Sequence, residues 1–157
     1  MIESSLVYLI NDNQYLMLLR NKKTHDINQN KWIGVGGKKE KNESFEECAI
    51  RETYEETGLK VHLLEHRGII DFHYEDKESE KIYVYTSTNF SGLLHECNEG
   101  ELSWINKNEV LNLNLWEGDR IFLNYILNDK NDLFYLHLFY DKYDKLIKYK
   151  LGEDEYE

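Results

Sequence analysis

Apolar runs separated by short polar segments predict a chain that consists mostly of β-strands. The runs are rich in Val, Ile, Leu, Tyr and Phe, which fit a pleated sheet, and Asn, Asp, Gly and Lys between them favour turns. Residues 11–14 and 141–145 are expected to be the turns of two hairpins, and residues 21–31 a polar loop. The expected strands are residues 6–10, 15–19, 32–35, 61–64, 68–74, 82–90, 101–105, 133–140 and 146–151.

Two helices are predicted, each on different grounds. Ser44 and Glu47 have the spacing of a capping box, so a helix should begin near Ser44, and Gly58 is suited to end it in a left-handed conformation. Residues 118–127 repeat apolar side chains at helical spacing. Strands without a regular alternation with helices favour an α+β fold, with a mixed sheet and helices against its faces.

Length and composition indicate a single domain with a true core. The chain has 157 residues, of which 41% are hydrophobic and 13% aromatic, and we find no linker or internal repeat. One domain is therefore expected over residues 1–157, with residues 152–157 as a frayed tail.

Charge and apolar patterning exclude several kinds of partner. The net charge of −11 argues against binding to duplex nucleic acid, which needs clustered Lys and Arg, although a metal ion would still permit a phosphate substrate. The chain has neither an apolar run long enough to span a membrane nor the pattern of a signal peptide. Two cysteines do not make a disulfide framework. We therefore expect a cytoplasmic protein, and the sequence predicts no oligomeric state.

The segment from residue 37 to residue 59 carries the chemistry. It contains the spacing G-x5-E-x7-R-E-x-x-E-E-x-G, formed by Gly37, Glu43, Arg51, Glu52, Glu55, Glu56 and Gly58. At about 100° per residue, the carboxylates of Glu52, Glu55 and Glu56 share one side of the predicted helix. Three crowded carboxylates repel one another, and a hard divalent cation such as Mg²⁺ would relieve that repulsion while also binding substrate phosphates.

This pattern resembles the signature of the Nudix hydrolases. All seven fixed positions match. The signature also has two bulky apolar positions: Leu59 matches the second, and Thr53, which is less apolar, is a mild departure at the first. The resemblance implies an α/β/α sandwich and hydrolysis of a phosphoanhydride with Mg²⁺, or alternatively Mn²⁺. It also implies Glu52, Glu55 and Glu56 as metal ligands, one glutamate as the base, and a carbonyl of Gly36 or Gly37 as a further ligand.

The same resemblance implies two supporting roles. Arg51 is expected to pair with Glu43 and to brace the loop against the helix. A glutamate from a later loop often completes the metal site in this family, and Glu99 is our first choice for it, with Glu101 the second.

Two further segments resemble the MutT-type branch, which hydrolyses oxidised purine nucleoside triphosphates. They are residues 31–38 and residues 115–122, and they imply that Trp116 stacks on the base and that Asp119 accepts a hydrogen bond from it. Arg20 and Lys38 are placed to reach a polyphosphate.

Two departures from that branch concern the base. A mammalian enzyme of the branch has asparagine where this chain has Ile33, and two adjacent aspartates where it has Gly118 and Asp119. Base recognition must therefore differ, since Ile33 cannot form a side-chain hydrogen bond.

The favoured reading is hydrolysis of a nucleoside triphosphate, such as 8-oxo-dGTP, to the monophosphate and pyrophosphate. Other Nudix substrates, namely ADP-ribose, dinucleoside polyphosphates or RNA 5′ ends, are one alternative. A non-catalytic nucleotide sensor is another. Loss of a motif glutamate would favour a sensor, whereas ADP-ribose enzymes often carry a proline beyond the motif, which this chain lacks.

Overall fold

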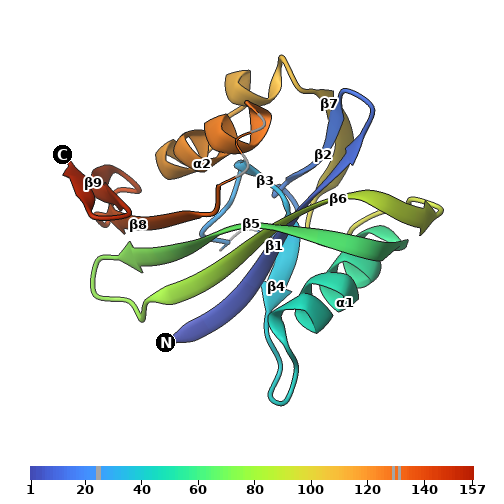
Figure 1. Cartoon of the computed structure of the whole chain (residues 1–157), viewed down its shortest axis with the longest axis horizontal. Helices are drawn as coiled ribbons and strands as arrows, with labels where there is room; N and C mark the ends of the chain where they lie inside the picture. The colour runs from blue at the N-terminus through green and yellow to red at the C-terminus, as the bar shows by residue number, and fades with distance from the viewer. Residues whose placement is uncertain (24–25, 129, 131) are drawn as a thin grey trace.

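A mixed β-sheet with one helix on each side makes up the fold (Figure 1). The computed structural model describes residues 1–23, 26–128, 130 and 132–157. The helices are α1 (Phe45–Thr57), α2 (Glu117–Leu127) and a short 3₁₀ turn, η1 (Val110–Asn112). The strands are β1 (Ile2–Asn11), β2 (Gln14–Leu19), β3 (Trp32–Ile33), β4 (Val35–Lys38), β5 (Leu59–Tyr74), β6 (Glu80–Gly92), β7 (Glu101–Asn106), β8 (Phe134–Tyr140), β9 (Leu146–Leu151) and β10 (Asp154–Tyr156).

Strand pairing brings distant parts of the chain together. The order across the sheet is β10-β9-β8-β5-β6-β1-β2-β3, with β4 paired to β1 and β7 paired to β2. The pairs β1–β6 and β5–β8 are parallel, and the other pairs are antiparallel. This mixture of parallel and antiparallel pairs confirms the predicted mixed sheet.

The sheet is covered by apolar side chains on both faces. In β1, Val7 packs into the core under α1, whereas its neighbour Tyr8 packs into the core under α2, because successive residues of a strand point to opposite faces. Phe122 and Leu123 of α2 are almost fully buried, and burial of each contributes about 1.5–3 kcal/mol to stability. The predicted α+β sandwich is therefore confirmed.

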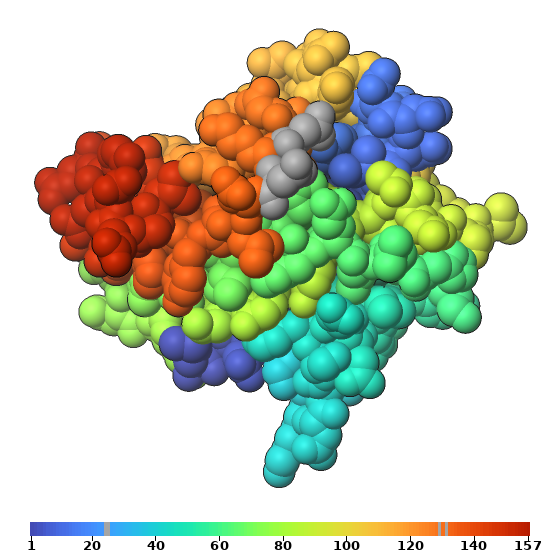
Figure 2. All heavy atoms as spheres, viewed as in Figure 1, coloured from blue at the N-terminus to red at the C-terminus, as the bar shows by residue number. Residues whose placement is uncertain are grey.

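Local patterns predicted most elements correctly. The hairpins β1–β2 and β8–β9, the strands β6 and β7, and both helices lie where expected, within a few residues at each end. The described part of residues 21–31 is a loop, while Thr24 and His25 lie outside the described residues. The loop between β4 and α1 projects from the body of the molecule (Figure 2).

Three expectations about strands were wrong. Residues 61–64 and 68–74 are parts of one continuous strand, β5. The polar residues between them stay in the strand, where the pairing with β6 shifts register. Residues 32–35 are not one strand, because Gly34 separates β3, which pairs with β2, from β4, which pairs with β1. The tail is not frayed, since β10 pairs with β9 and Tyr156 stacks on Tyr149.

No helix in the described part of the chain is long and apolar enough to cross a membrane.

Candidate active site

Helix α1 is held at both ends by the residues that the sequence predicts. The Ser44 side chain accepts from the Glu47 backbone N–H, and the Glu47 side chain accepts from that of Ser44, which completes a capping box. At the other end Gly58 has φ 81° and donates to the Tyr54 carbonyl. These caps fix where the motif carboxylates lie.

The three motif carboxylates have unequal surroundings. Glu56 lies on the inner side of α1 and is 9% exposed, and the Glu52 side chain is 17% exposed, whereas that of Glu55 is 57% exposed. Burial raises the pKa of Glu52. The exposure of the three carboxylates on this side of the helix therefore increases from Glu56 to Glu52 to Glu55.

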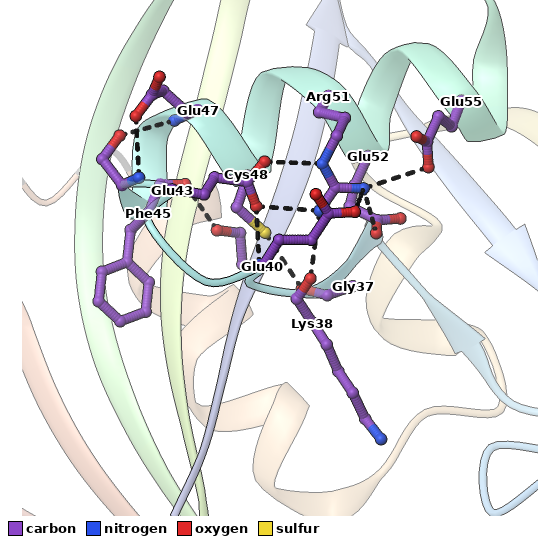
Figure 3. Close-up of polar contacts among 12 residues, drawn as sticks. Gly37, Lys38, Glu40, Glu43, Phe45, Glu47, Cys48, Arg51, Glu52 and Glu55 are labelled. Carbon is purple, nitrogen blue, oxygen red and sulfur yellow. Dashed lines mark hydrogen bonds and ion pairs between the residues drawn. The ribbon is translucent and has the colours of Figure 1, made fainter.

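Arg51 connects the loop to the helix (Figure 3). Its Nε and Nη2 atoms bind the two oxygens of Glu43 at 2.7 and 3.0 Å, and Nη2 also donates to the Lys38 carbonyl at 3.2 Å. Its Nη1 atom donates to Glu52 at 2.9 Å and to Glu55 at 3.2 Å. Hydrogen bonding to Arg51 lowers the pKa of Glu43 to about 2. The structure contains the predicted pair, while its contribution to activity stays a prediction.

Glu56 faces Gly36 of strand β4. Its Oε2 atom accepts from the Gly36 N–H at 3.3 Å. Burial, followed by the negative charge of Glu99 and then that of Glu52, raises the pKa of Glu56 to about 8. A buried carboxylate beside two others is a site where a cation would restore the charged form.

The paired glycines allow this close approach. Gly36 has φ 156°, and a Cβ atom there would lie 1.9 Å from the Ser5 carbonyl oxygen of β1. A Cβ atom on Gly37 would lie 2.6 Å from the carboxyl carbon of Glu52. The Gly37 carbonyl accepts from the Cys48 thiol at 3.4 Å.

Glu99 and its alternative Glu101 differ in their surroundings. Glu99 lies 3.4 Å from Arg20 Nη1 and 3.2 Å from Lys23 Nζ, and its side chain is 28% exposed. Glu101 is exposed at the start of β7, where it pairs with Leu19. Since the charge of Glu99 acts on both Glu52 and Glu56, it is the better placed of the two.

The donor set fits a hard divalent cation in its chemistry. Carboxylate and carbonyl oxygens are the ligands that Mg²⁺ prefers, and Glu52, Glu56, Glu99 and Gly37 supply them at neighbouring positions. Across the described residues, no three Asp, Glu, His or Cys side chains are gathered closely enough to hold a metal ion. Arg51 binds Glu52 and Glu55, so ligation requires these side chains to turn away from it.

One continuous cavity of about 350 Å³ is lined both by residues of this motif and by residues at the start of the other helix. At one end it is lined by Gly36, Gly37, Lys38 and Glu56, and Arg20 lines it too. The other end includes Trp116, Asp119, Ile33, Phe72 and Leu138. The cavity therefore brings one predicted catalytic residue, Glu56, together with the predicted base-binding residues Trp116 and Asp119, which lie far from it in the sequence.

Trp116 and Asp119 occupy the apolar end. Trp116 is 4% exposed and lies edge-on to Phe72 and Tyr140, with Lys31 Nζ 5.4 Å from its ring centre. It is thus both a core residue and part of the cavity wall. Burial raises the pKa of Asp119 to about 7, against the opposing charge of Lys31.

Two lining residues were not expected from the sequence. Asp26 binds Arg20 Nε at 2.7 Å and accepts from the Asn28 backbone N–H at 3.0 Å. Asn28 accepts from Trp116 Nε1 at 2.8 Å. The Asp-x-Asn spacing is a signal for such a turn, but its contact with Trp116, 88 residues away, has no local signature.

Comparison with known proteins agrees with this geometry. The family model described as NUDIX domain matches residues 3–126. The chain belongs to the Nudix family. Nudix hydrolases generally use divalent metal cations.

Several relatives of known name cover most of the chain. It is 28% identical over 156 residues to the oxidized purine nucleoside triphosphate hydrolase of Danio rerio, covering 99% of each chain. The enzyme of the same name from Mus musculus is 27% identical over 137 residues, covering 87% of this chain and 86% of that one. The crystal structure of the Mutator MutT protein from Bacillus halodurans superposes with a TM-score of 0.87 at 27% identity, covering 97% of this chain and 98% of that one.

Proposed function

We propose that this Nudix protein hydrolyses a nucleoside triphosphate to the monophosphate and pyrophosphate. The observation that carries the proposal is the cavity of about 350 Å³, which is lined both by the motif residues Glu56, Gly36 and Gly37 and by Trp116 and Asp119. Such a shape suits a ligand with phosphates at one end and a base at the other. The names of the relatives from Danio rerio and Mus musculus support the same class of substrate.

The metal in this proposal is Mg²⁺, with Mn²⁺ able to replace it. Glu52, Glu55, Glu56 and Glu99 and the Gly37 carbonyl would hold it. When bound, such an ion neutralises phosphate charge and lowers the pKa of a coordinated water molecule. Glu56 lines the cavity beside Gly36, which supports its place among the ligands, and a nearby cation would favour its ionised form.

The remaining residues position the substrate and move a proton. Arg20 and Lys38 line the cavity near the motif, where each can pair with phosphate oxygens. A motif glutamate accepts a proton from the attacking water. Arg51 and Glu43 keep the loop between β4 and α1 against the helix, so their effect on activity comes through the geometry of that loop.

Trp116 and Asp119 would contact the base. The indole supplies an apolar wall, and Asp119 supplies a hydrogen-bonding carboxyl group. Since Ile33 contributes only apolar surface, we expect a modest rather than strict preference for oxidised purines.

We also propose that the protein acts in the cytoplasm on free nucleotides. Cys48 and Cys97 are both buried free thiols, as expected in a compartment where disulfides do not form. The net charge of −11 supports a small-molecule substrate over duplex nucleic acid.

A nucleotide panel tests the proposal. Pyrophosphate and phosphate release should be measured with Mg²⁺ on 8-oxo-dGTP, dGTP, dATP, ADP-ribose and a dinucleoside polyphosphate. We expect pyrophosphate release, with triphosphates turned over faster than the other substrates. Turnover of ADP-ribose alone would overturn the proposal, and binding without turnover of any nucleotide would indicate a sensor.

A matched variant then tests the base-binding end. Asp119→Asn should change the ratio of kcat/KM for 8-oxo-dGTP over dGTP, because the substitution replaces a carboxyl group by an amide of the same shape. An unchanged ratio would locate the base elsewhere.

A further inference from the structure

The side-chain amide of Asn28 has a defined orientation at the cavity wall. Its Oδ1 atom lies 2.8 Å from Trp116 Nε1. An indole N–H only donates, so the atom of Asn28 that faces it must be the oxygen. The NH₂ group of Asn28 therefore points away from the indole, and among the described residues no protein group accepts a hydrogen bond from it.

The loop around Asn28 is held in place by contacts with Asp26 and, through it, with Arg20. Asp26 accepts from the Asn28 backbone N–H at 3.0 Å, and its other oxygen lies 2.7 Å from Arg20 Nε. The side chains of Asp26 and Arg20 are only 7% and 14% exposed. The Lys31 N–H also donates to the Asn28 carbonyl at 2.8 Å. Asn28 is thus preorganised, as a group that selects a ligand must be.

Few other polar side chains at the cavity are free to read a base. The hydroxyls of Ser4 and Ser5 donate to Glu80 and to the Phe45 carbonyl, at 2.5 and 2.8 Å. Ile33 and Phe72 contribute only apolar surface to the wall near Trp116. This leaves the Asn28 amide to donate a hydrogen bond to the base and the Asp119 carboxyl group to accept one from it.

We propose that Asn28 is a specificity-determining residue whose NH₂ group donates to a carbonyl oxygen of the base, so that purines with a 6-oxo group are preferred over purines with a 6-amino group. A 6-oxo purine presents an acceptor to Asn28 and an adjacent N–H donor to Asp119. A 6-amino purine would set its own donors against the NH₂ group of Asn28, and donors left unpaired in a buried site are costly. This inference rests on the proposed nucleoside triphosphate hydrolysis.

Asn28→Asp tests the proposal with little change of shape. The variant keeps an oxygen for Trp116 Nε1 and replaces the NH₂ donor by an acceptor. The ratio of kcat/KM for dGTP over dATP should fall about tenfold or more relative to wild type, since one donor–acceptor match is reversed. Gln29→Glu is the matched control: it adds the same charge one residue away, on an exposed side chain that does not line this cavity, and should leave the ratio unchanged.

A residue that only positions Trp116 would behave differently. Asn28→Ala removes the contact to the indole, and a purely structural role would then raise KM for both nucleotides by the same factor and leave the ratio unaltered. An unchanged ratio in both Asn28→Asp and Asn28→Ala, with turnover retained, overturns the assignment of Asn28 and leaves the proposed function standing. If wild type turns over no nucleoside triphosphate, both proposals fail.

Substrate analogues give a second test that does not depend on the folding of any variant. Wild-type enzyme should be assayed with inosine triphosphate, which has a 6-oxo group and the adjacent N1–H, and with purine riboside triphosphate, which has neither. The proposal expects kcat/KM to be about tenfold higher for inosine triphosphate. Equal values for the two analogues overturn it.

Discussion

At the scale of single residues, Glu56 concentrates the chemistry of the site. It is 9% exposed, accepts from Gly36, and lies beside the charges of Glu99 and Glu52. In Glu56→Gln the shape remains while the charge is lost, so we expect kcat to fall about 10²-fold or more. Glu46→Gln, an exposed position on the same helix, is the control and should keep wild-type kcat. A normal kcat in Glu56→Gln would remove this residue from the catalytic group.

Glu56 also predicts how stability of the metal-free protein depends on pH. Its pKa is about 8 in the folded protein, against 4.5 as a model value, so the folded state binds the proton more tightly. Its stabilising contribution is present in full below about pH 4.5 and is lost as pH rises towards 8, with a slope of at most about 1.4 kcal/mol per pH unit. Melting curves in EDTA should show a smaller loss between pH 5 and pH 8 for Glu56→Gln than for wild type. The Asp119 pKa of about 7 acts in the same direction, so some decline should remain.

Arg51 has a structural role that can be separated from that of Glu56. Its side chain is 24% exposed and that of Glu43 12% exposed, so removing Arg51 leaves a largely buried carboxylate without its partner. Arg51→Ala should lower the free energy of unfolding by about 3 kcal/mol at neutral pH, as well as activity. Lys41→Ala, on the exposed part of the same loop, is the control for thermal denaturation. Equal melting temperatures for Arg51→Ala and wild type would contradict a bracing role.

At the scale of elements, the sequence predicts those helices and hairpins whose ends are determined by residues a few positions apart. The capping box and Gly58 define α1, and turn residues define the hairpins, because each depends on neighbours a few positions away. The motif glutamates were placed correctly on α1 for the same reason. Continuity of β5 and formation of β10 depend instead on pairing with distant strands, which no local pattern encodes. No local pattern identifies Asn28, because its partner Trp116 is 88 residues away.

The paired glycines of β4 give a prediction at this scale. In Gly36→Ala the new methyl group would collide with the Ser5 carbonyl of β1, at a φ of 156° that L residues rarely adopt, so the β1–β4 pairing should be disrupted. In Gly37→Ala the collision is with the end of the Glu52 side chain, which can rotate. We expect Gly36→Ala to lose folded protein and Gly37→Ala to fold but to lose activity. Thermal denaturation and kcat measured on both variants separate these effects, and similar behaviour of the two would refute the distinction.

At the scale of the whole molecule, the fold brings two separate parts of the chain to one cavity. Helix α1 supplies Glu56, β4 supplies Gly36 and Gly37, and the chain at the start of α2 supplies Trp116 and Asp119. The two helices lie on opposite sides of the sheet (Figure 1). The sequence could name both sets of residues through family resemblance. It could not show that one cavity joins them, because this requires the pairing of β1 with β4 and β6. The assignment of residues 1–157 to a single domain stays a prediction.

The net charge of −11 and the crowded carboxylates lead to a final prediction about the metal. An ion that binds the folded protein but not the unfolded chain stabilises it by RT ln(1 + [L]/Kd), about 2.7 kcal/mol at 100 Kd. Activity should require Mg²⁺ or Mn²⁺ and disappear in excess EDTA, and either ion should raise the melting temperature of wild type. The control is NaCl at the same ionic strength, which screens surface repulsion without ligation and should raise it less. In Glu56→Gln the specific part of the rise should shrink, because a neutral amide is a weaker ligand than the carboxylate it replaces. Full turnover in EDTA, or equal stabilisation by NaCl and MgCl₂ in wild type, would show that the carboxylates of α1 do not act through a bound cation.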